Sequence, residues 1–299
     1  MQLPILAQGV AQSCALWLVH RSRERVPKVY AWQFAVRTYE IGADERVRLP
    51  VYLNYLEESA TQASAWCGYS YAWYRAHKRA WFARKTYLRH FAEAQIGDQL
   101  IMQTWVSDYR RVQSHREYDL RRADGTPILR GRTNWVYVDT ESLRPVRLPE
   151  QFYEAFLPSG ELEPLETGVT DFTPIQGLRH ETSRTVQVYE IDSAAHVNNS
   201  VYVAWAQQAV HEALRELDLS YTPFGREIEY LRSARPDEPL RLICQLVGLA
   251  DQRMLWRTEI LSAASGERLT LDLAVYSLSA PLSKRQLERL TAPERRLSP

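Results

Sequence analysis

Two stretches of this chain, 150 positions apart, share an ungapped pattern of fourteen residues. The first is YEIGADERVRLPVY, residues 39–52, and the second is YEIDSAAHVNNSVY, residues 189–202. Six of the fourteen positions are identical, and the apolar frame is kept. So much agreement without a gap is hard to obtain by chance. The pattern therefore indicates an internal duplication, and it predicts two similar domains rather than one large one.

The differences between the two copies concern reactive side chains. Four of the positions that differ matter for chemistry. They are Asp192 in place of Gly42, His196 in place of Arg46, Asn198 in place of Arg48 and Asn199 in place of Leu49. The first copy thus lacks the reactive groups. The second copy opens an apolar run to about residue 217, whose length and composition suit a buried helix. We expect a single active site at the start of that helix.

The elements around these two copies come in the same order. In the first half a strand is expected near 32–38 and a long helix after Pro50, because proline is favoured in a first helical turn. Four runs rich in Trp, Tyr, Val and Thr then predict strands at 81–91, 100–107, 112–120 and 128–139. In the second half the strand is expected at 182–189, the helix at 199–217, and strands at 227–232, 240–249, 253–261 and 269–278.

Smaller echoes extend the duplication. Gly266 matches Gly125 in the turn before the last strand, Val275-Tyr276 resembles Val136-Tyr137, and Tyr230-Leu231-Arg232 resembles Tyr87-Leu88-Arg89. The expected organisation is an N-terminal extension or helix (1–29), a first domain (30–150), a Pro-, Gly- and Glu-rich linker (151–177), a second domain (178–282), and a tail with a short basic helix (283–299). Each domain is predicted to be an antiparallel sheet curled around its helix, giving an α+β fold in which the two sheets pair side by side and cover one edge each.

Charge and cysteine content exclude several classes of protein. Lys+Arg 37 against Asp+Glu 36 gives a net charge of +1, which argues against a dedicated nucleic-acid binder. Cys14, Cys67 and Cys244 are far apart and show no CxxC spacing, so neither a disulfide framework nor a zinc site is expected, and a reducing cytoplasm is the natural compartment. Residues 3–19 are too short and too polar for a membrane span, although they leave a cleaved signal open.

Residues 189–209, YEIDSAAHVNNSVYVAWAQQA, resemble the signature of hotdog-fold thioesterases. In that signature an acid is followed four residues later by His-Val-Asn-Asn, and a Tyr and a Trp follow on the central helix. The duplication, together with residues 131–149, GRTNWVYVDTESLRPVRLP, resembles the acyl-ACP thioesterases, which are fused double-hotdog enzymes that release free fatty acids from acyl carrier protein. The resemblance covers about residues 30–280. It implies a tandem double hotdog fold and acyl thioester hydrolysis, with chain-length selection in the first half and without a metal or redox cofactor.

The sequence departs from that family at three positions. The family has an Asn where this chain has Ala194, and it has a Glu-Cys pair where this chain has Ser233 and Ala234. Single-hotdog acyl-CoA thioesterases carry the same Asp and His-Val-Asn-Asn without that Asn. The resemblance therefore leaves open whether the substrate is carried by acyl carrier protein or by CoA.

Thioester hydrolysis needs an attacking water or carboxylate and a positive environment for the oxyanion. Backbone N–H groups at a helix start, aided by the helix dipole, can polarise the carbonyl. Asp192 is then the general base or nucleophile, and His196 orients the acid, the water or the thioester. The alternative makes Asp192 a turn or cap residue and His196 a hydrogen-bonded core residue. Asn198 and Asn199, with Val197 before them, mark the helix start and either amide could serve only as a cap.

A second acid and a docking surface are less well marked. Glu57 or Glu58 lies opposite the site if the halves pair about a pseudo-twofold axis, although a solvated helix face explains both. Ser233 could hydrogen-bond a water, or it is an ordinary strand serine. The basic run at 74–85 could bind the acidic carrier or CoA phosphates, or it is a solvated loop; its basic residues are Arg75, Lys78, Arg79, Arg84 and Lys85.

The sequence therefore favours a cytoplasmic double-hotdog thioester hydrolase with one active site. Two competitors stay open: a hotdog dehydratase or hydratase acting on acyl chains, and a non-catalytic acyl-binding protein. No nucleic acid and no membrane insertion are expected, and two chains could associate as a homodimer.

Overall fold

The structure is a computed structural model that describes residues 28–158 and 165–292. The predicted N-terminal extension up to residue 27, with Cys14, and the last seven residues lie outside the described residues. The elements of the first half are β1 (Tyr30–Ala35), η1 (Thr38–Glu40), α1 (Leu49–Trp66), α2 (Tyr71–Ala76), β2 (Arg79–His90), β3 (Gln99–Arg110), β4 (Gln113–Arg122), β5 (Pro127–Asp139) and α3 (Gln151–Phe156).

The second half repeats this order. Its elements are β6 (Arg179–Thr185), η2 (Val188–Glu190), α4 (Asn199–Leu214), β7 (Tyr221–Tyr230), β8 (Pro239–Ala250), β9 (Arg253–Ser262), β10 (Arg268–Leu278) and α5 (Lys284–Thr291). The predicted elements are therefore present. The strands expected at 32–38 and 182–189 end earlier, because in each half the chain turns through a 3₁₀ helix before it reaches the hairpin loop.

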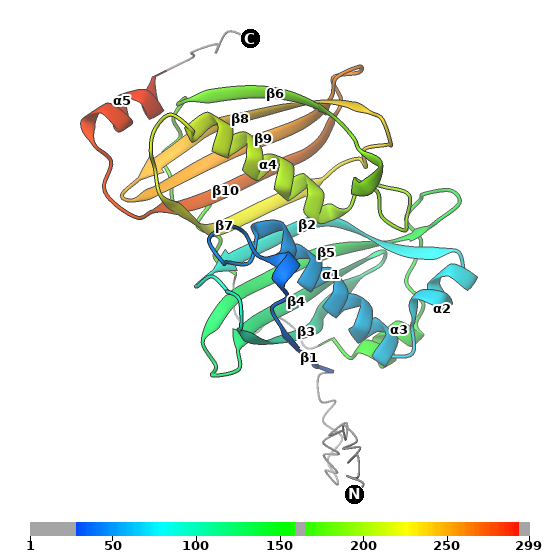
Figure 1. Ribbon diagram of the computed structural model, residues 1–299. Coiled ribbons are helices and arrows are strands. Elements are labelled where there is room, and N and C mark those ends of the chain that lie inside the picture. The colour runs from blue at the N-terminus through cyan, green and yellow to red at the C-terminus, as the bar shows by residue number, and fades with distance from the viewer. Residues whose placement is uncertain (1–27, 159–164, 293–299) are drawn as a thin grey trace, which may run out of the picture.

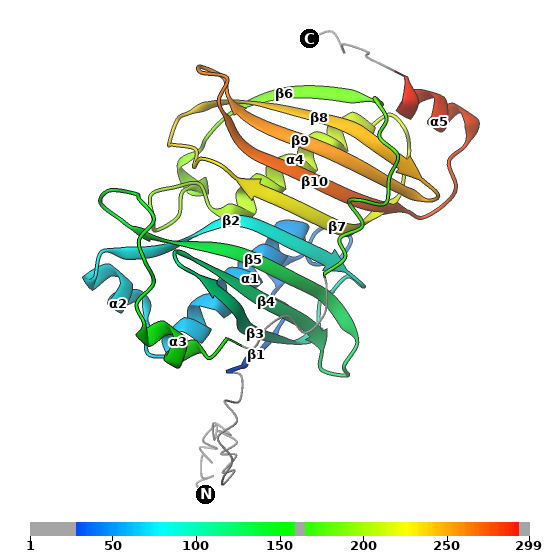
Figure 2. The same cartoon turned by 180° about the vertical axis from the view of Figure 1, so that it is seen from behind.

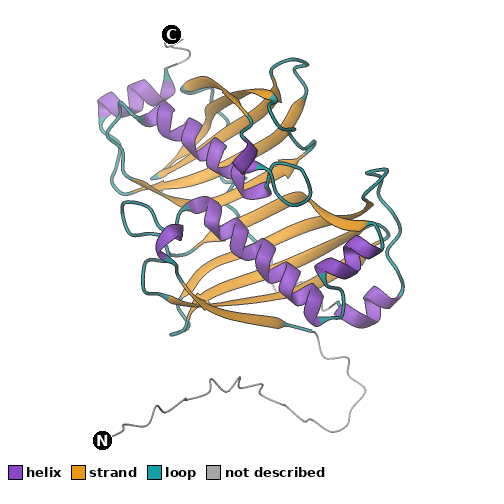
Figure 3. Ribbon diagram, turned by 45° about the vertical axis from the view of Figure 1, so that its right-hand side comes forward, coloured by secondary structure: helices purple, strands orange, loops and turns teal. Residues whose placement is uncertain are grey.

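The ten strands of the described residues form one antiparallel sheet in the order β1-β3-β4-β5-β2-β7-β10-β9-β8-β6 (Figure 1). The two halves join where β2 pairs with β7, from Lys85 opposite Glu229 to Arg89 opposite Gly225. The helices α1 and α4 lie on the same face of the sheet and contact each other (Figure 3). Seen from behind, the strands lie in front of both helices (Figure 2). This is the α+β tandem double hotdog arrangement that the sequence predicts.

The central helix of each half is positioned by a buried tyrosine. The Tyr52 hydroxyl of α1 accepts a hydrogen bond from Ala94 N–H at 2.9 Å, and Tyr202 of α4 accepts one from Ala234 N–H at 2.7 Å. Both tyrosines are almost fully buried. Each helix is thereby tied to the loop that follows the strand beneath it. The two halves share this contact as a consequence of the duplication.

The strands show that two of the sequence echoes were wrong in register. The Tyr52 ring packs against His90, and the Tyr202 ring packs against Tyr230, so the ends of β2 and β7 correspond at a spacing of 140. Matching Tyr87 to Tyr230 shifts that register by three, and an odd shift would turn every side chain to the opposite face. By the same pairing Val136 corresponds to Ser277, not to Val275. The match of Gly125 to Gly266 holds, since both take the positive φ that their turns require.

The region predicted as a linker contains a short helix that sequence patterns missed. Phe152 and Phe156 of α3 are buried in an aromatic cluster of the first half, against Tyr69, Trp73 and Tyr137. The start of the connection therefore packs on the first half. The exact domain boundaries stay a prediction.

Candidate active site

The loop before α4 is a tight hairpin. Ile191 pairs with Val197, and Asp192 N–H donates to the His196 carbonyl at 2.8 Å. Ala195 closes the turn at a φ of +61°. The first copy folds in the same way, since Gly42 N–H donates to the Arg46 carbonyl at 2.8 Å and Glu45 has a φ of +63°. The two hairpins thus share a backbone, and only their side chains differ.

Asp192 is partly buried and takes part in its own turn. One carboxylate oxygen, Oδ1, accepts a hydrogen bond from Ala194 N–H at 2.8 Å. This is the turn role that the sequence left open for Asp192. The other oxygen makes no hydrogen bond within the described residues and is available to another group.

His196 extends toward the first half. Its imidazole packs edge-on against the Phe82 ring of β2, with the two ring centroids 5.5 Å apart. The ring is partly buried, and within the described residues it makes no hydrogen bond to Asp192 or to any other side chain. His196 is therefore positioned by an aromatic contact between the two halves, not by the hydrogen bond expected of a core histidine.

Asn198 is the N-cap of α4 and also reaches across to α1. Its Oδ1 accepts hydrogen bonds from Ser200 N–H at 2.9 Å and from the Ser200 hydroxyl at 2.7 Å. Its amide Nδ2 donates to Glu57 Oε2 at 3.1 Å. One side chain thus caps the helix of the second half and holds an acid of the first half. Val197, just before it, is buried and fixes the hairpin to the core.

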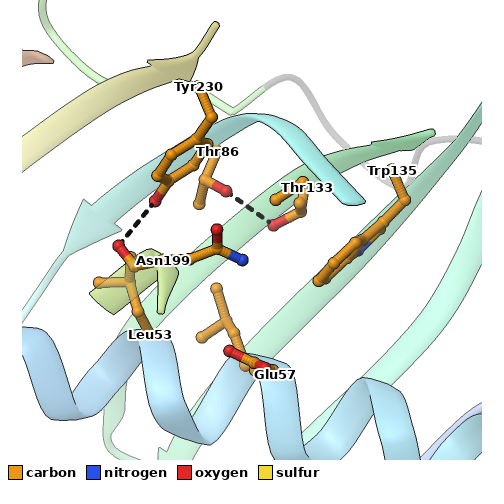
Figure 4. Close-up of a pocket in the computed structure, with 9 residues that line it drawn as sticks. Leu53, Glu57, Thr86, Thr133, Trp135, Asn199 and Tyr230 are labelled. Atoms are coloured by element: carbon orange, nitrogen blue, oxygen red, sulfur yellow. Dashed lines mark hydrogen bonds between the residues drawn. The ribbon is translucent and has the colours of Figure 1, made fainter. Parts of the chain in front are cut away.

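A small cavity of about 20 Å³ lies between α1 and the sheet, where α4 begins. A water needs roughly 10–15 Å³ on the same measure, so the cavity has room for about one water and is too small for an acyl chain without side-chain movement. Figure 4 shows Glu57 and Asn199 pointing into it from the two helices. Its lining is Leu53, Leu56, Glu57, Ala83, Thr86, Thr133, Trp135, Asn199 and Tyr230.

Polar contacts on the sheet form the far wall of this cavity. The Thr86 and Thr133 hydroxyls hydrogen-bond each other at 3.1 Å across β2 and β5. The Tyr230 hydroxyl donates to the Asn199 carbonyl at 3.2 Å (Figure 4). The Trp135 indole N–H donates to the Tyr118 hydroxyl at 3.2 Å. The polar groups of this wall are therefore hydrogen-bonded to one another or to their neighbours. The Glu57 carboxylate and the side-chain amide of Asn199 face the cavity (Figure 4).

Glu57 is the acid of this cavity. Burial raises its pKa above the ordinary value, the hydrogen bond from Asn198 lowers it, and the negative charges of Asp192 and Glu58 raise it further. Glu57 and Asp192 are therefore close enough to interact. Its neighbour Glu58 is exposed and accepts a hydrogen bond from Gln62 Nε2 at 2.7 Å, as expected of a solvated helix face.

Other predicted residues lie away from the cavity. The Ser233 carbonyl accepts from Arg232, and the Ser233 side chain does not line the cavity. Ala194 presents an exposed methyl group at the turn. The basic run is largely neutralised by acids of the same chain, through the ion pairs Lys78–Glu141, Arg79–Asp139, Arg84–Glu229 and Lys85–Glu227. Of its five cations only Arg75 lacks an ion pair within the described residues.

The thiols fit a structural role. Burial raises the pKa of Cys67 and raises that of Cys244 to about 12, so both stay protonated near neutral pH. Within residues 28–158 and 165–292, no three His, Cys, Asp or Glu side chains gather as a metal site would require. In the same part of the chain, no helix combines the length and apolarity needed to cross a membrane.

Comparison with protein-family models assigns both halves. Residues 27–156 match the acyl-ACP thioesterase N-terminal domain, and residues 194–268 match the thioesterase superfamily. Among curated proteins, the chain is 23% identical over 259 residues to the chloroplastic dodecanoyl-[acyl-carrier-protein] hydrolase of Umbellularia californica, covering 81% of this chain and 65% of that protein. It is 21% identical over 219 residues to the chloroplastic oleoyl-acyl carrier protein thioesterase 2 of Arabidopsis thaliana, covering 67% and 60%. The chain thus spans less than two thirds of the length of these relatives.

Solved structures show the same fold. The acyl-ACP thioesterase from Bacteroides thetaiotaomicron superimposes with a TM-score of 0.68 at 17% identity, covering 83% of this chain and 98% of that one. The 12:0-ACP thioesterase from Umbellularia californica superimposes with a TM-score of 0.67 at 20% identity, covering 84% and 94%. The resemblance to acyl-ACP thioesterases and the tandem double hotdog fold predicted from the sequence are thereby confirmed.

Proposed function

We propose that this chain is a thioester hydrolase that releases free fatty acid from an acyl thioester, with acyl-ACP as the first candidate substrate and acyl-CoA as the second. The observation that carries the proposal is the convergence of Glu57, Asn198 and the Asp192 hairpin at the start of α4. That arrangement occurs in a fold whose two halves both match thioesterase families. The names of the plant relatives support the carrier-protein substrate.

The start of α4 supplies the positive environment that the reaction needs. The first backbone N–H groups of a helix lack partners inside the helix, and the helix dipole adds partial positive charge there. A thioester carbonyl directed at this end would be polarised, and the oxyanion formed by attack would be stabilised. Asn198 caps only part of this end, through Ser200 N–H.

Asp192 and His196 carry the roles that the resemblance implies. Asp192 is the general base or nucleophile, and its second carboxylate oxygen is the atom available for this role. His196 orients the thioester against the first half through its contact with Phe82. Asn199 contributes an amide that can hold a water or the substrate in the cavity. A cytoplasmic location and a homodimer, both expected from the sequence, stay predictions.

An assay with acyl-ACP and acyl-CoA thioesters of several chain lengths, read as free thiol, tests the proposal. We expect thiol release, and we expect Asp192→Ala to lower kcat/KM by about 10²–10⁴-fold. Asp44→Ala is the matched control, because Asp44 lies in the first hairpin and its carboxylate also accepts a backbone N–H there, from Arg46. It should leave activity unchanged.

The same assay separates the competitors. A dehydratase or hydratase would convert hydroxyacyl or enoyl thioesters without releasing thiol, and an acyl-binding protein would bind thioesters unchanged. If wild-type protein released no thiol from either panel, the hydrolase proposal would be rejected. If Asp192→Ala kept full activity, only the role of Asp192 would be lost.

A further inference from the structure

Glu57 belongs to the half of the chain whose repeated stretch lacks reactive groups. The helices correspond at a spacing of 150, which two further contacts confirm. The Tyr55 hydroxyl of α1 donates to Glu40 at 2.6 Å, and the Trp205 indole of α4 donates to Glu190 at 2.9 Å. By this register the counterpart of Glu57 is Gln207. The acid is therefore present only in α1, because the corresponding position of α4 carries a neutral amide.

The contact between Glu57 and Asn198 likewise occurs on one side of the molecule only. The counterpart of Asn198 is Arg48, whose guanidinium donates to the Tyr39 carbonyl at 2.6 Å. Within the described residues, no hydrogen bond joins Arg48 to Gln207. The pseudo-twofold arrangement is thus broken at the point where the cavity, the start of α4 and the Asp192 hairpin meet.

A carboxylate at this position is not required for packing. A glutamine has the same shape, and its carbonyl could accept the same hydrogen bond from the Asn198 amide. The carboxylate also stands near the charge of Asp192 and is partly removed from water, both of which disfavour its ionised form. An unfavourable charge in a cavity beside a helix start is a mark of a functional group.

We propose that Glu57 is a catalytic residue of the hydrolysis reaction, acting as the general base for a water held in the cavity. This inference rests on the proposed function. The Glu57 carboxylate takes a proton from the water as the water oxygen forms a bond to the thioester carbonyl carbon. When the carbon–sulfur bond breaks, the proton passes from Glu57 to the departing sulfur, so the products are a carboxylic acid and a free thiol.

This assignment narrows the role of Asp192. Two carboxylates in different environments can divide the acid and base roles of one reaction. With a water as nucleophile and proton transfer assigned to Glu57, Asp192 retains the role of the negative charge that raises the pKa of Glu57. The active site is then composite: the second half supplies the helix start and the hairpin, and the first half supplies the base.

Glu57→Gln tests the assignment while keeping the shape and the Asn198 contact. We expect kcat to fall by about 10²-fold or more with KM changed by less than about 3-fold, because a glutamine cannot take the proton. In wild-type protein kcat/KM should rise with pH as Glu57 ionises, and this limb should be absent from the residual activity of Glu57→Gln. Glu57→Asp should recover part of the lost kcat.

Two variants serve as matched controls. Glu58→Gln removes the exposed neighbouring acid and should leave kcat unchanged and the pH limb present, moved only slightly to lower pH because the Glu58 charge is the last of the causes that raise the pKa of Glu57. Glu57→Gln combined with Gln207→Glu moves the acid to the equivalent position of α4 and should not restore activity. Recovery in the double variant would overturn the inference, because it would show that the position of the acid does not matter.

The outcomes separate this inference from the proposed function. The role of Glu57 as base would be overturned if Glu57→Gln retained kcat within about 2-fold of wild type, kept the pH limb, or changed only KM. Thiol release by the wild-type protein would still support hydrolysis in that case. If wild type released no thiol, the proposed function itself would fail. Circular dichroism and thermal unfolding of Glu57→Gln show that a loss of kcat comes from a folded protein.

Discussion

The two halves of this molecule share a frame and differ in what fills it. In both, a tyrosine of the central helix binds the loop after the strand beneath it, and a buried glutamate accepts a hydrogen bond from an aromatic residue of the same helix. Beneath α1, Thr86 of β2 lines the small cavity. Beneath α4, the matching position is Arg226, whose side chain is buried.

Arg226 belongs to a buried polar network. Its Nη1 lies 3.1 Å from each carboxylate oxygen of Asp272, and its Nη2 donates to the Tyr276 hydroxyl at 2.9 Å. Burial raises the pKa of Asp272 to about 6, whereas the Asp272 charge raises the pKa of Arg226 despite burial. The geometry of a paired guanidinium and carboxylate favours both being charged at neutral pH. The second half thus holds a buried ion pair at the position that corresponds to Thr86, which lines the cavity in the first half.

This difference changes the meaning of the duplication. The second half carries the sequence signature, yet it has a buried ion pair at the position matching the cavity residue Thr86. The first half lost, or never had, the hairpin side chains, yet it provides the cavity and Glu57. Neither half alone contains the candidate site, because each half supplies different residues to it.

The largest expected effect comes from breaking the network that closes the second half. Asp272→Ala should lower the free energy of unfolding by about 3–5 kcal/mol, because Arg226 is left as an unpaired buried charge. Urea denaturation measures it. Replacing both partners, as Arg226→Met with Asp272→Ala, should cost less than Asp272→Ala alone. A loss below about 1 kcal/mol for Asp272→Ala would mean that water replaces the carboxylate and that this interior is not closed.

A smaller effect tests whether the two frames are equivalent. Tyr52→Phe and Tyr202→Phe each leave one backbone N–H, of Ala94 or Ala234, without its buried acceptor. Each should cost about 1–3 kcal/mol, and the two costs should be similar and additive because the sites are in different halves. Urea denaturation of both single variants and the double variant provides the measurement. A large loss of unfolding free energy for only one of the two variants would show that this tyrosine contact stabilises only one half.

The sequence was sufficient for what depends on local pattern. The ungapped repeat predicted two similar domains, the His-Val-Asn-Asn run predicted a helix from about Asn199 with an asparagine cap, and Asp192 could be placed in a turn before it. These features depend on neighbours within a few residues, and they are therefore visible in a single sequence.

The rest depends on pairing between distant segments. Thr86 and Thr133 meet only because β2 lies beside β5, and Tyr230 lines the cavity beside Thr86 only because β7 lies beside β2. Glu57 could be suggested from a pseudo-twofold axis but not distinguished from Glu58, since one position along a helix rotates a side chain by about 100°. Strand echoes misled the register for the same reason, because a small shift in a strand changes the face that a residue occupies.

The smallest expected effect sharpens the contrast between Glu57 and Gln207. Glu57→Gln should raise the stability of the protein at neutral pH, because it removes a carboxylate whose ionised form is disfavoured in the folded state. The pKa of Glu57 is raised in the fold first by burial and then by Asp192 and Glu58, from an ordinary value of 4.5. The folded state therefore prefers the protonated acid. Its contribution to stability is complete below pH 4.5 and is lost as the pH rises through the raised pKa.

Thermal unfolding of both proteins at pH 4 and pH 7 measures this linkage. The melting temperatures should be close at pH 4, where Glu57 is protonated in both states, and the variant should be the more stable protein at pH 7. A difference that does not change with pH would mean that Glu57 is as well solvated in the fold as in the unfolded chain. Lower activity together with higher stability of Glu57→Gln at neutral pH would indicate that the carboxylate serves catalysis rather than packing. Gln207 shows that a neutral amide satisfies packing at the corresponding position of α4.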